Sequence, residues 1–237
     1  MKTPIIIILF FTSLTTRAQQ MEAAGLLYVV NKPRVQSIKP SLLIMLHGYG
    51  SNEQDLMGLA GYLPPQFLVV SARAPITLSA GSYAWFRLDL STGKPVYDSE
   101  EAERARQQLF LFMDEVKKKY DASEVLLLGF SQGAIMSYSV ALTQPQKVKG
   151  IVALSGRVLT DIDPHLASAA QLQKLNIFIG HGTKDEVLPF YNGEAAYLKC
   201  KNLGAQVTFK EYPVGHEISG PELTHIQKWL ATILSGN

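Results

Sequence analysis

The sequence is poor in cysteine, in long apolar runs and in net charge, and each shortage excludes a class of protein. Cys200 is the only cysteine, so an internal disulfide and a zinc site built from cysteines are excluded. No run of about 20 apolar residues is present, so the sequence predicts no integral membrane segment. The formal net charge is only +2, which provides no basic surface for nucleic acid. With 237 residues, of which 47% are hydrophobic, the chain is long enough to bury one sizeable core.

The first residues have a composition of their own. Lys2 precedes an apolar run from Ile5 to Phe11, and the small residue Ala18 ends the segment. This order is typical of a secretory signal peptide cleaved after Ala18, although a first hydrophobic strand of the fold is an alternative. We therefore expect residues 1–18 to be a signal peptide and residues 19–237 to form the folded domain. The expected location is the periplasm or the exterior, and the cytoplasm is the alternative.

Short apolar segments alternate with longer segments of 3.6-residue period, the pattern of a mostly parallel sheet covered by helices. The predicted strands are Leu26–Val30, Leu42–Leu46, Phe67–Ser71, Val125–Leu128, Ile151–Leu154, Ile177–Ile179 and Val207–Tyr212. The predicted helices are Asn52–Leu63, a long helix ending near Tyr120, Ala134–Thr143, Phe190–Leu203 and Glu222–Leu234. These elements predict an α/β fold with a doubly wound sheet, whose ligands bind at the carboxyl ends of the strands.

Two of the predicted helices carry start signals. Ser51 with Gln54 has the spacing of a capping box for the first helix, and Asp98 with Glu101 has the same spacing for the long one. The segment from 156 to 174, where this kind of fold often carries an inserted cap, is too short for a domain. We therefore expect no cap domain and a fairly open site.

The segment Gly129-Phe130-Ser131-Gln132-Gly133 has the pattern G-x-S-x-G and lies between a predicted strand and a predicted helix. A sharp strand-to-helix turn needs small residues beside the serine, and it holds the hydroxyl exposed above the sheet. The start of the following helix has free N–H groups and a partial positive charge, which suit a developing oxyanion. An ordinary serine in a glycine-rich turn is the alternative. The context favours Ser131 as a nucleophile.

A serine nucleophile needs a base, and five histidines compete for this role. His216 lies in a loop between the last predicted strand and the last predicted helix, where a side chain can reach the strand ends. The others lie in a turn before the serine, directly after a strand, in an irregular stretch and within the last helix: His47, His181, His165 and His225. We expect His216 to be the base.

The orienting acid is expected between the serine and the histidine in the chain. Asp185 follows a predicted strand in the turn that begins at His181. Asp161 and Asp163 follow the preceding strand and are the alternatives, although turn and capping roles around Pro164 also explain them. The order of the residues favours Asp185.

Two further segments complete the predicted site. The turn Leu46-His47-Gly48-Tyr49-Gly50 ends a predicted strand, and its backbone N–H groups can approach a reacting carbonyl together with the N–H after the nucleophile. The expected oxyanion donors are thus the main-chain amides of Tyr49 and Gln132. The long irregular stretch from 73 to 97 contains Trp85 and Phe86, which we interpret as one wall of the substrate pocket. Packing of these aromatic side chains on the core is the alternative.

Five motifs in order resemble the phospholipase/carboxylesterase family, which includes the acyl-protein thioesterases. They are LHGYG at 46–50, AWF at 84–86, GFSQG at 129–133, HGTKDEVLP at 181–189 and VGHEIS at 214–219. The resemblance runs from about residue 26 to the end and implies a small α/β-hydrolase fold without a cap, a metal or a cofactor. It implies the same triad of Ser131, Asp185 and His216, and the same oxyanion donors. The chain departs from the family's best-known members, which are cytoplasmic, because it starts with an expected export signal.

Three functions compete at this stage. The leading hypothesis is hydrolysis of small-molecule carboxylic esters with small to medium acyl or aryl groups, through an acyl-enzyme. The second is a thioesterase acting on acylated proteins or acyl-CoA, which would use identical machinery. The third is a catalytically silent binding protein with the same fold. The intact set of nucleophile, acid, base and oxyanion turn favours an enzyme, whereas its natural substrate and oligomeric state are not encoded in a recognisable pattern.

Overall fold

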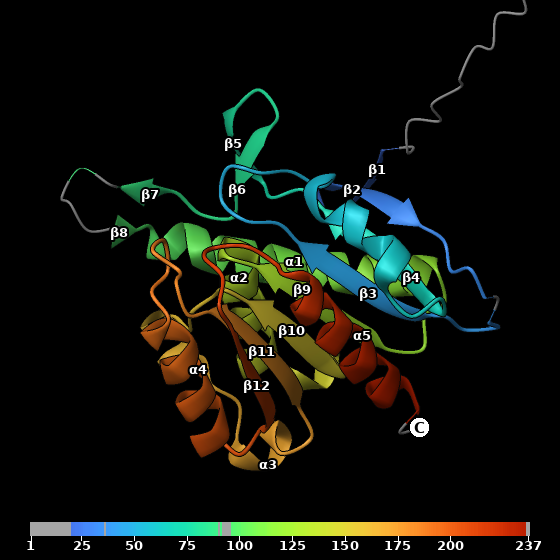
Figure 1. Ribbon diagram of the computed structural model, residues 1–237. Helices are drawn as coiled ribbons and strands as arrows, with labels where there is room; N and C mark the ends of the chain where they lie inside the picture. Colours follow the sequence, from blue (N-terminus) through green and yellow to red (C-terminus); the bar gives the residue numbers. More distant parts are fainter. Residues whose placement is uncertain (1–19, 36, 90, 92–95, 236–237) are drawn as a thin grey trace, which may run out of the picture.

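The computed structural model describes residues 20–35, 37–89, 91 and 96–235, and an eight-stranded sheet forms their centre (Figure 1). Across the sheet the strands are β1 (Met21–Ala23), β2 (Leu26–Asn31), β4 (Phe67–Ala72), β3 (Ser41–Leu46), β9 (Val125–Phe130), β10 (Gly150–Leu154), β11 (Asn176–Gly182) and β12 (Gln206–Tyr212). The pairs from β4 to β12 are parallel, whereas β1–β2 and β2–β4 are antiparallel. The prediction of a mostly parallel, doubly wound sheet is confirmed.

Helices cover both faces of the sheet because successive side chains of each buried strand point to opposite faces. On β3, Leu42, Ile44 and Leu46 belong to one core cluster, and Leu43 and Met45 belong to another. The first cluster packs under α1 (Ser99–Lys119), α2 (Gln132–Thr143), α3 (Ala169–Leu172) and α4 (Tyr191–Asn202). The second packs under the 3₁₀ helix η1 (Asp55–Tyr62) and under α5 (Gly220–Ser235). The described residues thus form an α/β architecture with one hydrophobic core on each face of the sheet.

The stretch from 73 to 97 is less irregular than its sequence suggests. It contains two small antiparallel hairpins, β5 (Ile76–Ser79) with β6 (Ser82–Ala84), and β7 (Leu88–Asp89) with β8 (Val96–Tyr97). Figure 1 shows both hairpins beyond the sheet, on the side of the β9–α2 connection. Strands this short have too few residues to show a period of two, and the edge strand β1 escaped prediction for the same reason.

The two predicted helix start signals are only partly confirmed. The predicted helix at 52–63 is the 3₁₀ helix η1, and Asn52 Oδ1, not Ser51, accepts the Gln54 N–H at 2.9 Å. Ser51 instead forms an isolated β-bridge with Tyr83. Asp98 accepts the Glu101 N–H at 3.0 Å as predicted. The Glu101 carboxylate, however, accepts from Arg87 instead of closing a capping box.

Two predictions on chain organisation can be compared with the structure. Residues 156–174 contain only the 3₁₀ helix η3 (Thr160–His165) and the one-turn helix α3, so the absence of a cap domain is confirmed. Within the described ranges, no helix has the length and hydropathy needed to cross a membrane. The expected signal peptide, residues 1–18, lies outside the described residues.

Candidate active site

Ser131 occupies a sharp turn between β9, which ends at Phe130, and α2, which begins at Gln132. Its backbone lies at φ 54° and ψ −117°, a region that residues with a side chain rarely adopt. A Cβ added at Gly129 would lie 2.3 Å from Gly133 O, and one added at Gly133 would lie 1.9 Å from Leu46 O. The two glycines of the motif are therefore required by close backbone contacts, which bring the turn against the end of β3.

Three side chains from separate strand ends form a continuous hydrogen-bonded chain. Ser131 Oγ lies 2.9 Å from His216 Nε2, and His216 Nδ1 lies 2.7 Å from Asp185 Oδ2. The carboxylate accepts the proton of Nδ1, so Nε2 keeps a lone pair directed at the serine hydroxyl. The three residues predicted to form a triad are thus brought together with the tautomer that a general base needs.

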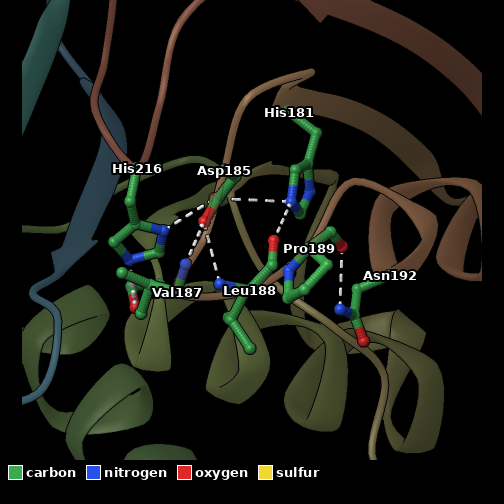
Figure 2. A network of polar contacts seen from close by, with 8 residues as sticks. His181, Asp185, Val187, Leu188, Pro189, Asn192 and His216 are labelled. Carbon is green, nitrogen blue, oxygen red and sulfur yellow. Dashed lines mark hydrogen bonds and ion pairs between the residues drawn. The ribbon is translucent and has the colours of Figure 1, made fainter.

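Backbone hydrogen bonds hold the acid in place (Figure 2). Asp185 follows β11, and its Oδ1 accepts the N–H groups of Val187 and Leu188 at 2.9 and 2.8 Å. The carboxylate is fully buried, and these contacts supply the hydrogen bonds that a buried charge requires. The acid turn, residues 181–188, therefore fixes the position of the Asp185 carboxylate through contacts that do not involve His216.

His216 lies on the base loop, residues 213–219, which connects β12 to α5. This loop packs directly on the acid turn, because Lys184 N–H donates to Val214 O at 3.0 Å. A Cβ added at Gly182 would lie 2.2 Å from Gly215 O, so only glycine allows the two segments to approach this closely. The base loop and the acid turn thus form one unit.

His181 lies behind Asp185, on the side away from His216 (Figure 2). Its Nε2 donates to Leu188 O at 2.7 Å and lies 3.5 Å from Asp185 Oδ2. Its Nδ1 is buried without a hydrogen-bond partner in the described structure. Burial lowers the pKa of His181, so the ring is neutral at neutral pH. It therefore does not neutralise the Asp185 carboxylate, whose negative charge can interact with His216.

The remaining histidines have other contacts. His47 is fully buried at the end of β3, where Nδ1 lies 2.7 Å from Gly48 O and Nε2 accepts the Ala74 N–H at 3.0 Å. His225 lies on α5 and is 3.1 Å from the Tyr212 hydroxyl. His165 lies on η3 and lines a cleft of about 420 Å³ between α1, α2 and η3.

The alternative acids lie away from the triad. Asp163 forms an ion pair with Lys199. Asp161 hydrogen-bonds the Tyr97 hydroxyl, whose pKa rises to about 12 chiefly because of burial, and it lines the same cleft as His165. No triad residue lines that cleft, so the geometry favours Asp185 as the acid.

The oxyanion turn, residues 47–50, lies directly beside the nucleophile. A Cβ added at Gly48 would be 3.3 Å from Ser131 Cβ. Gly50, at φ 80°, donates its N–H to Tyr83 O at 2.9 Å and so ties the turn to the β5–β6 hairpin. For the main-chain amides of Tyr49 and Gln132, the described part of the chain shows no acceptor. Both predicted donors are thus near the nucleophile with an N–H to offer.

Trp85 and Phe86 do not line an open pocket. Both side chains are 0% exposed, and the Phe86 ring packs on Tyr97 with 5.7 Å between ring centroids. The structure therefore corresponds to the alternative interpretation, in which these aromatic residues pack on the core. The contacts that Trp85 makes with Gln132 and His47 were not predicted, because they span 47 and 38 residues of sequence and no local pattern encodes them.

The described residues contain no group of three or more His, Cys, Asp or Glu side chains arranged to hold a metal ion. Cys200 is buried on α4, and burial raises the pKa of its thiol to about 12. A thiol in that state is not a nucleophile at neutral pH. The Ser131 hydroxyl, by contrast, lies within hydrogen-bonding distance of an imidazole nitrogen, at 2.9 Å from His216 Nε2.

Comparisons with known proteins show which family the chain resembles. The sequence profile of the family described as Phospholipase/Carboxylesterase matches residues 29–234. The chain is 29% identical to carboxylesterase SOBER1 of Arabidopsis thaliana over 169 residues, 69% of this chain and 74% of that protein. It is 29% identical to acyl-protein thioesterase 1 of Aspergillus fumigatus over 230 residues, 85% of this chain and 94% of that protein. Among solved structures, esterase PE8 is similar with a TM-score of 0.76 and 28% identity, covering 86% of this chain and 97% of that one.

Proposed function

The chain belongs to the phospholipase/carboxylesterase family of α/β-hydrolases, and we propose that it cleaves carboxylic esters through an acyl-enzyme on Ser131. The single observation that carries this proposal is the unbroken hydrogen-bonded chain from Ser131 through His216 to Asp185, at 2.9 and 2.7 Å. Family membership supports an enzyme that hydrolyses ester bonds, and the geometry supports the roles of individual residues.

The first half of the reaction forms the acyl-enzyme. Ser131 Oγ attacks the ester carbonyl carbon while its proton passes to His216 Nε2. Asp185 stabilises the imidazolium that results, because its carboxylate already accepts the Nδ1 proton. When the tetrahedral intermediate collapses, the C–O bond to the alcohol breaks, and the alcohol leaves with the proton from His216.

The second half releases the acid. A water molecule gives a proton to His216 Nε2 as its oxygen attacks the acyl carbon, and the bond to Ser131 Oγ then breaks as the serine recovers that proton. In both halves the negative charge on the carbonyl oxygen faces the amides of Tyr49 and Gln132. Gln132 also opens α2, whose N-terminus favours negative charge.

Substitution of the nucleophile tests this proposal. Ser131→Ala should fold normally and keep only the residual rate over water, roughly 10³–10⁴-fold, that the oxyanion hole and substrate binding supply. Hydrolysis of a p-nitrophenyl ester and labelling by a fluorophosphonate report on the hydroxyl independently. A folded variant with nearly full esterase activity would refute the proposal, and an unlabelled, inactive wild-type protein would point to a silent binding protein.

The proposed substrates are oxygen esters with small to medium acyl or aryl groups. The absence of a cap domain, together with the Tyr49 side chain 38% exposed beside the nucleophile, supports an open site. The second candidate is a thioesterase, because one relative carries that name and one triad attacks both kinds of ester. Values of kcat/KM for matched oxygen esters and thioesters of increasing acyl length decide between them. Higher values for long-chain thioesters would favour the second candidate.

The proposed location is outside the cytoplasm, since residues 1–18 have the composition of an export signal. Acyl-CoA is absent there, which supports oxygen esters as the physiological substrates. Terminal sequencing of the native protein should begin at Gln19. A native chain that retains Met1 in the cytoplasm would contradict export.

A further inference from the structure

The side chain of Gln132, whose main-chain amide is a candidate oxyanion donor, is held by a distant segment. The Trp85 N–H donates to Gln132 Oε1 at 2.8 Å, and Gln132 Nε2 donates to Phe86 O at 2.7 Å. Both bonds are buried, where a hydrogen bond is costly to lose. The side-chain amide of Gln132 is thereby fixed in position and orientation by the backbone of Trp85 and Phe86.

The same segment holds the oxyanion turn. Trp85 Nε1 donates to His47 O at 3.0 Å, and this carbonyl precedes Gly48 in the turn that contains Tyr49. The Trp85 indole is fully buried, so this bond is also shielded from water. One residue therefore contacts both segments that carry the candidate donors.

The ring of His47 extends this support to the amide of Tyr49. Because the Ala74 N–H donates to Nε2 at 3.0 Å, the proton of the neutral ring must lie on Nδ1, which donates to Gly48 O at 2.7 Å. Burial lowers the pKa of His47 and keeps the ring neutral. In a trans peptide the C=O and the following N–H point in opposite directions. Holding the Gly48 carbonyl toward the ring thus turns the Tyr49 N–H away from it.

We propose that Trp85 is a positioning residue of the oxyanion hole, which sets the Gln132 amide through its backbone and the Tyr49 amide through its indole and His47. This inference rests on the proposed reaction, but it assigns a role that the sequence interpretation of Trp85 as a pocket wall did not contain. A fully buried side chain does not touch substrate, so its effect on catalysis passes through the two amides.

Trp85→Phe tests the indole bond, because it removes Nε1 and keeps an aromatic ring and the backbone N–H. Loss of an entire oxyanion donor lowers kcat about 10²–10³-fold. Displacement of a donor that is still present should lower kcat less than its loss does, and we expect kcat to fall by roughly 10–100-fold. KM should stay within about threefold, since a donor aimed at the oxyanion acts mainly in the transition state. Affinity for an aryl trifluoromethyl ketone, whose adduct with Ser131 carries an oxyanion, should fall together with kcat.

Gln132→Met is a second variant, which removes both side-chain bonds to the segment and keeps the main-chain N–H. It should show the same fall in kcat at nearly constant KM, and it carries the test if Trp85→Phe does not fold. Trp229→Phe is the matched control. Trp229 lies on α5 beside Phe178 and Gly150, at the amino end of the sheet, so its replacement should leave kcat unchanged.

Two outcomes would overturn the inference. A folded Trp85→Phe variant with wild-type kcat and a lower melting temperature would make Trp85 purely structural. A higher KM with unchanged kcat and unchanged ketone affinity would make it a pocket wall. Neither outcome affects the proposed reaction, which fails if Ser131→Ala remains active or if the wild-type protein is inactive and is not labelled by a fluorophosphonate.

Discussion

The two halves of the site each contain a buried histidine at the end of a strand, followed by glycine, but the two histidines are not equally satisfied. His47, beside the oxyanion turn, uses both ring nitrogens in hydrogen bonds. His181, behind the acid turn, uses Nε2 and leaves Nδ1 buried without a partner in the described structure. Burial lowers the pKa of both rings. The histidine ring of the oxyanion half is thus fully paired, whereas the ring of the acid–base half has one unpaired nitrogen in the described structure.

A second group increases this asymmetry. Glu222 lies at the start of α5, directly after the base loop, and burial raises the pKa of its carboxyl to about 7. Its carboxylate accepts the Ser219 N–H at 3.2 Å and so anchors the end of that loop. In the proposed reaction, the oxyanion half presents fixed dipoles, whereas the other half moves protons. The difference between the two histidine rings parallels this proposed division of roles.

Replacing the acid should have the largest effect. Asp185→Asn should lower kcat by about 10⁴, as loss of the orienting carboxylate does in serine proteases. The amide cannot accept the Nδ1 proton in the same way, so the wrong tautomer faces Ser131. Steady-state hydrolysis of a p-nitrophenyl ester measures the loss.

Asp161→Asn and Asp163→Asn are the matched controls, because they make the same chemical change at residues that contact Tyr97 and Lys199. Both should keep kcat within a few-fold of the wild type. A large loss at either position with a mild Asp185→Asn variant would move the acid to the connection after β10.

The next largest effect concerns pH and the free energy of unfolding. Because the folded protein holds the Glu222 proton up to about pH 7, against a usual pKa of 4.5, the unfolded chain binds fewer protons between these values. The free energy of unfolding should therefore fall as pH rises from 4.5 to 7, by about 3 kcal/mol at most, and level off above. Glu222→Gln carries no charge and should lose this slope in urea titrations. An unchanged slope in the variant would assign the pH dependence to other groups.

The smallest effects compare the two histidines directly. Glutamine can place an N–H where His181 Nε2 lies, so His181→Gln should keep its one hydrogen bond and lose less than about 1 kcal/mol of stability. Asparagine reaches only the Nδ1 position of His47, and glutamine reaches only the Nε2 position. Each should leave one buried group unpaired at a cost of about 1–3 kcal/mol. Urea unfolding of the three variants measures the difference, and equal losses at both positions would refute the asymmetry.

The sequence predicted the secondary structure correctly where the interactions that determine it are local in the chain. The buried strands and their helices were predicted within a few residues, because continuous apolar runs and a 3.6-residue period are local properties. The three residues expected to form the triad meet in the structure because the carboxyl ends of parallel strands share one edge of the sheet.

The sequence was uninformative where a contact joins distant segments. Trp85 was expected in a pocket wall, since an aromatic residue in a long loop gives no sign of its depth. In the structure Trp85 is buried and donates hydrogen bonds to His47 O and Gln132 Oε1. Ser51 was expected to cap a helix, but its backbone pairs with Tyr83 instead. Both cases are ones in which tertiary hydrogen bonds override a local signal.

Because the backbone of Ser131 has a positive φ, stability and activity favour different residues at this position. A non-glycine residue at φ 54° and ψ −117° costs about 1–3 kcal/mol, which the packing of Gly129 and Gly133 must offset. Glycine adopts such angles without a side-chain clash, so Ser131→Gly should be inactive and yet harder to unfold than the wild type. Selection for thermostability alone would therefore tend to replace Ser131, the proposed nucleophile, by glycine. Any stabilised version of this chain has to be screened for turnover at the same time as for melting temperature.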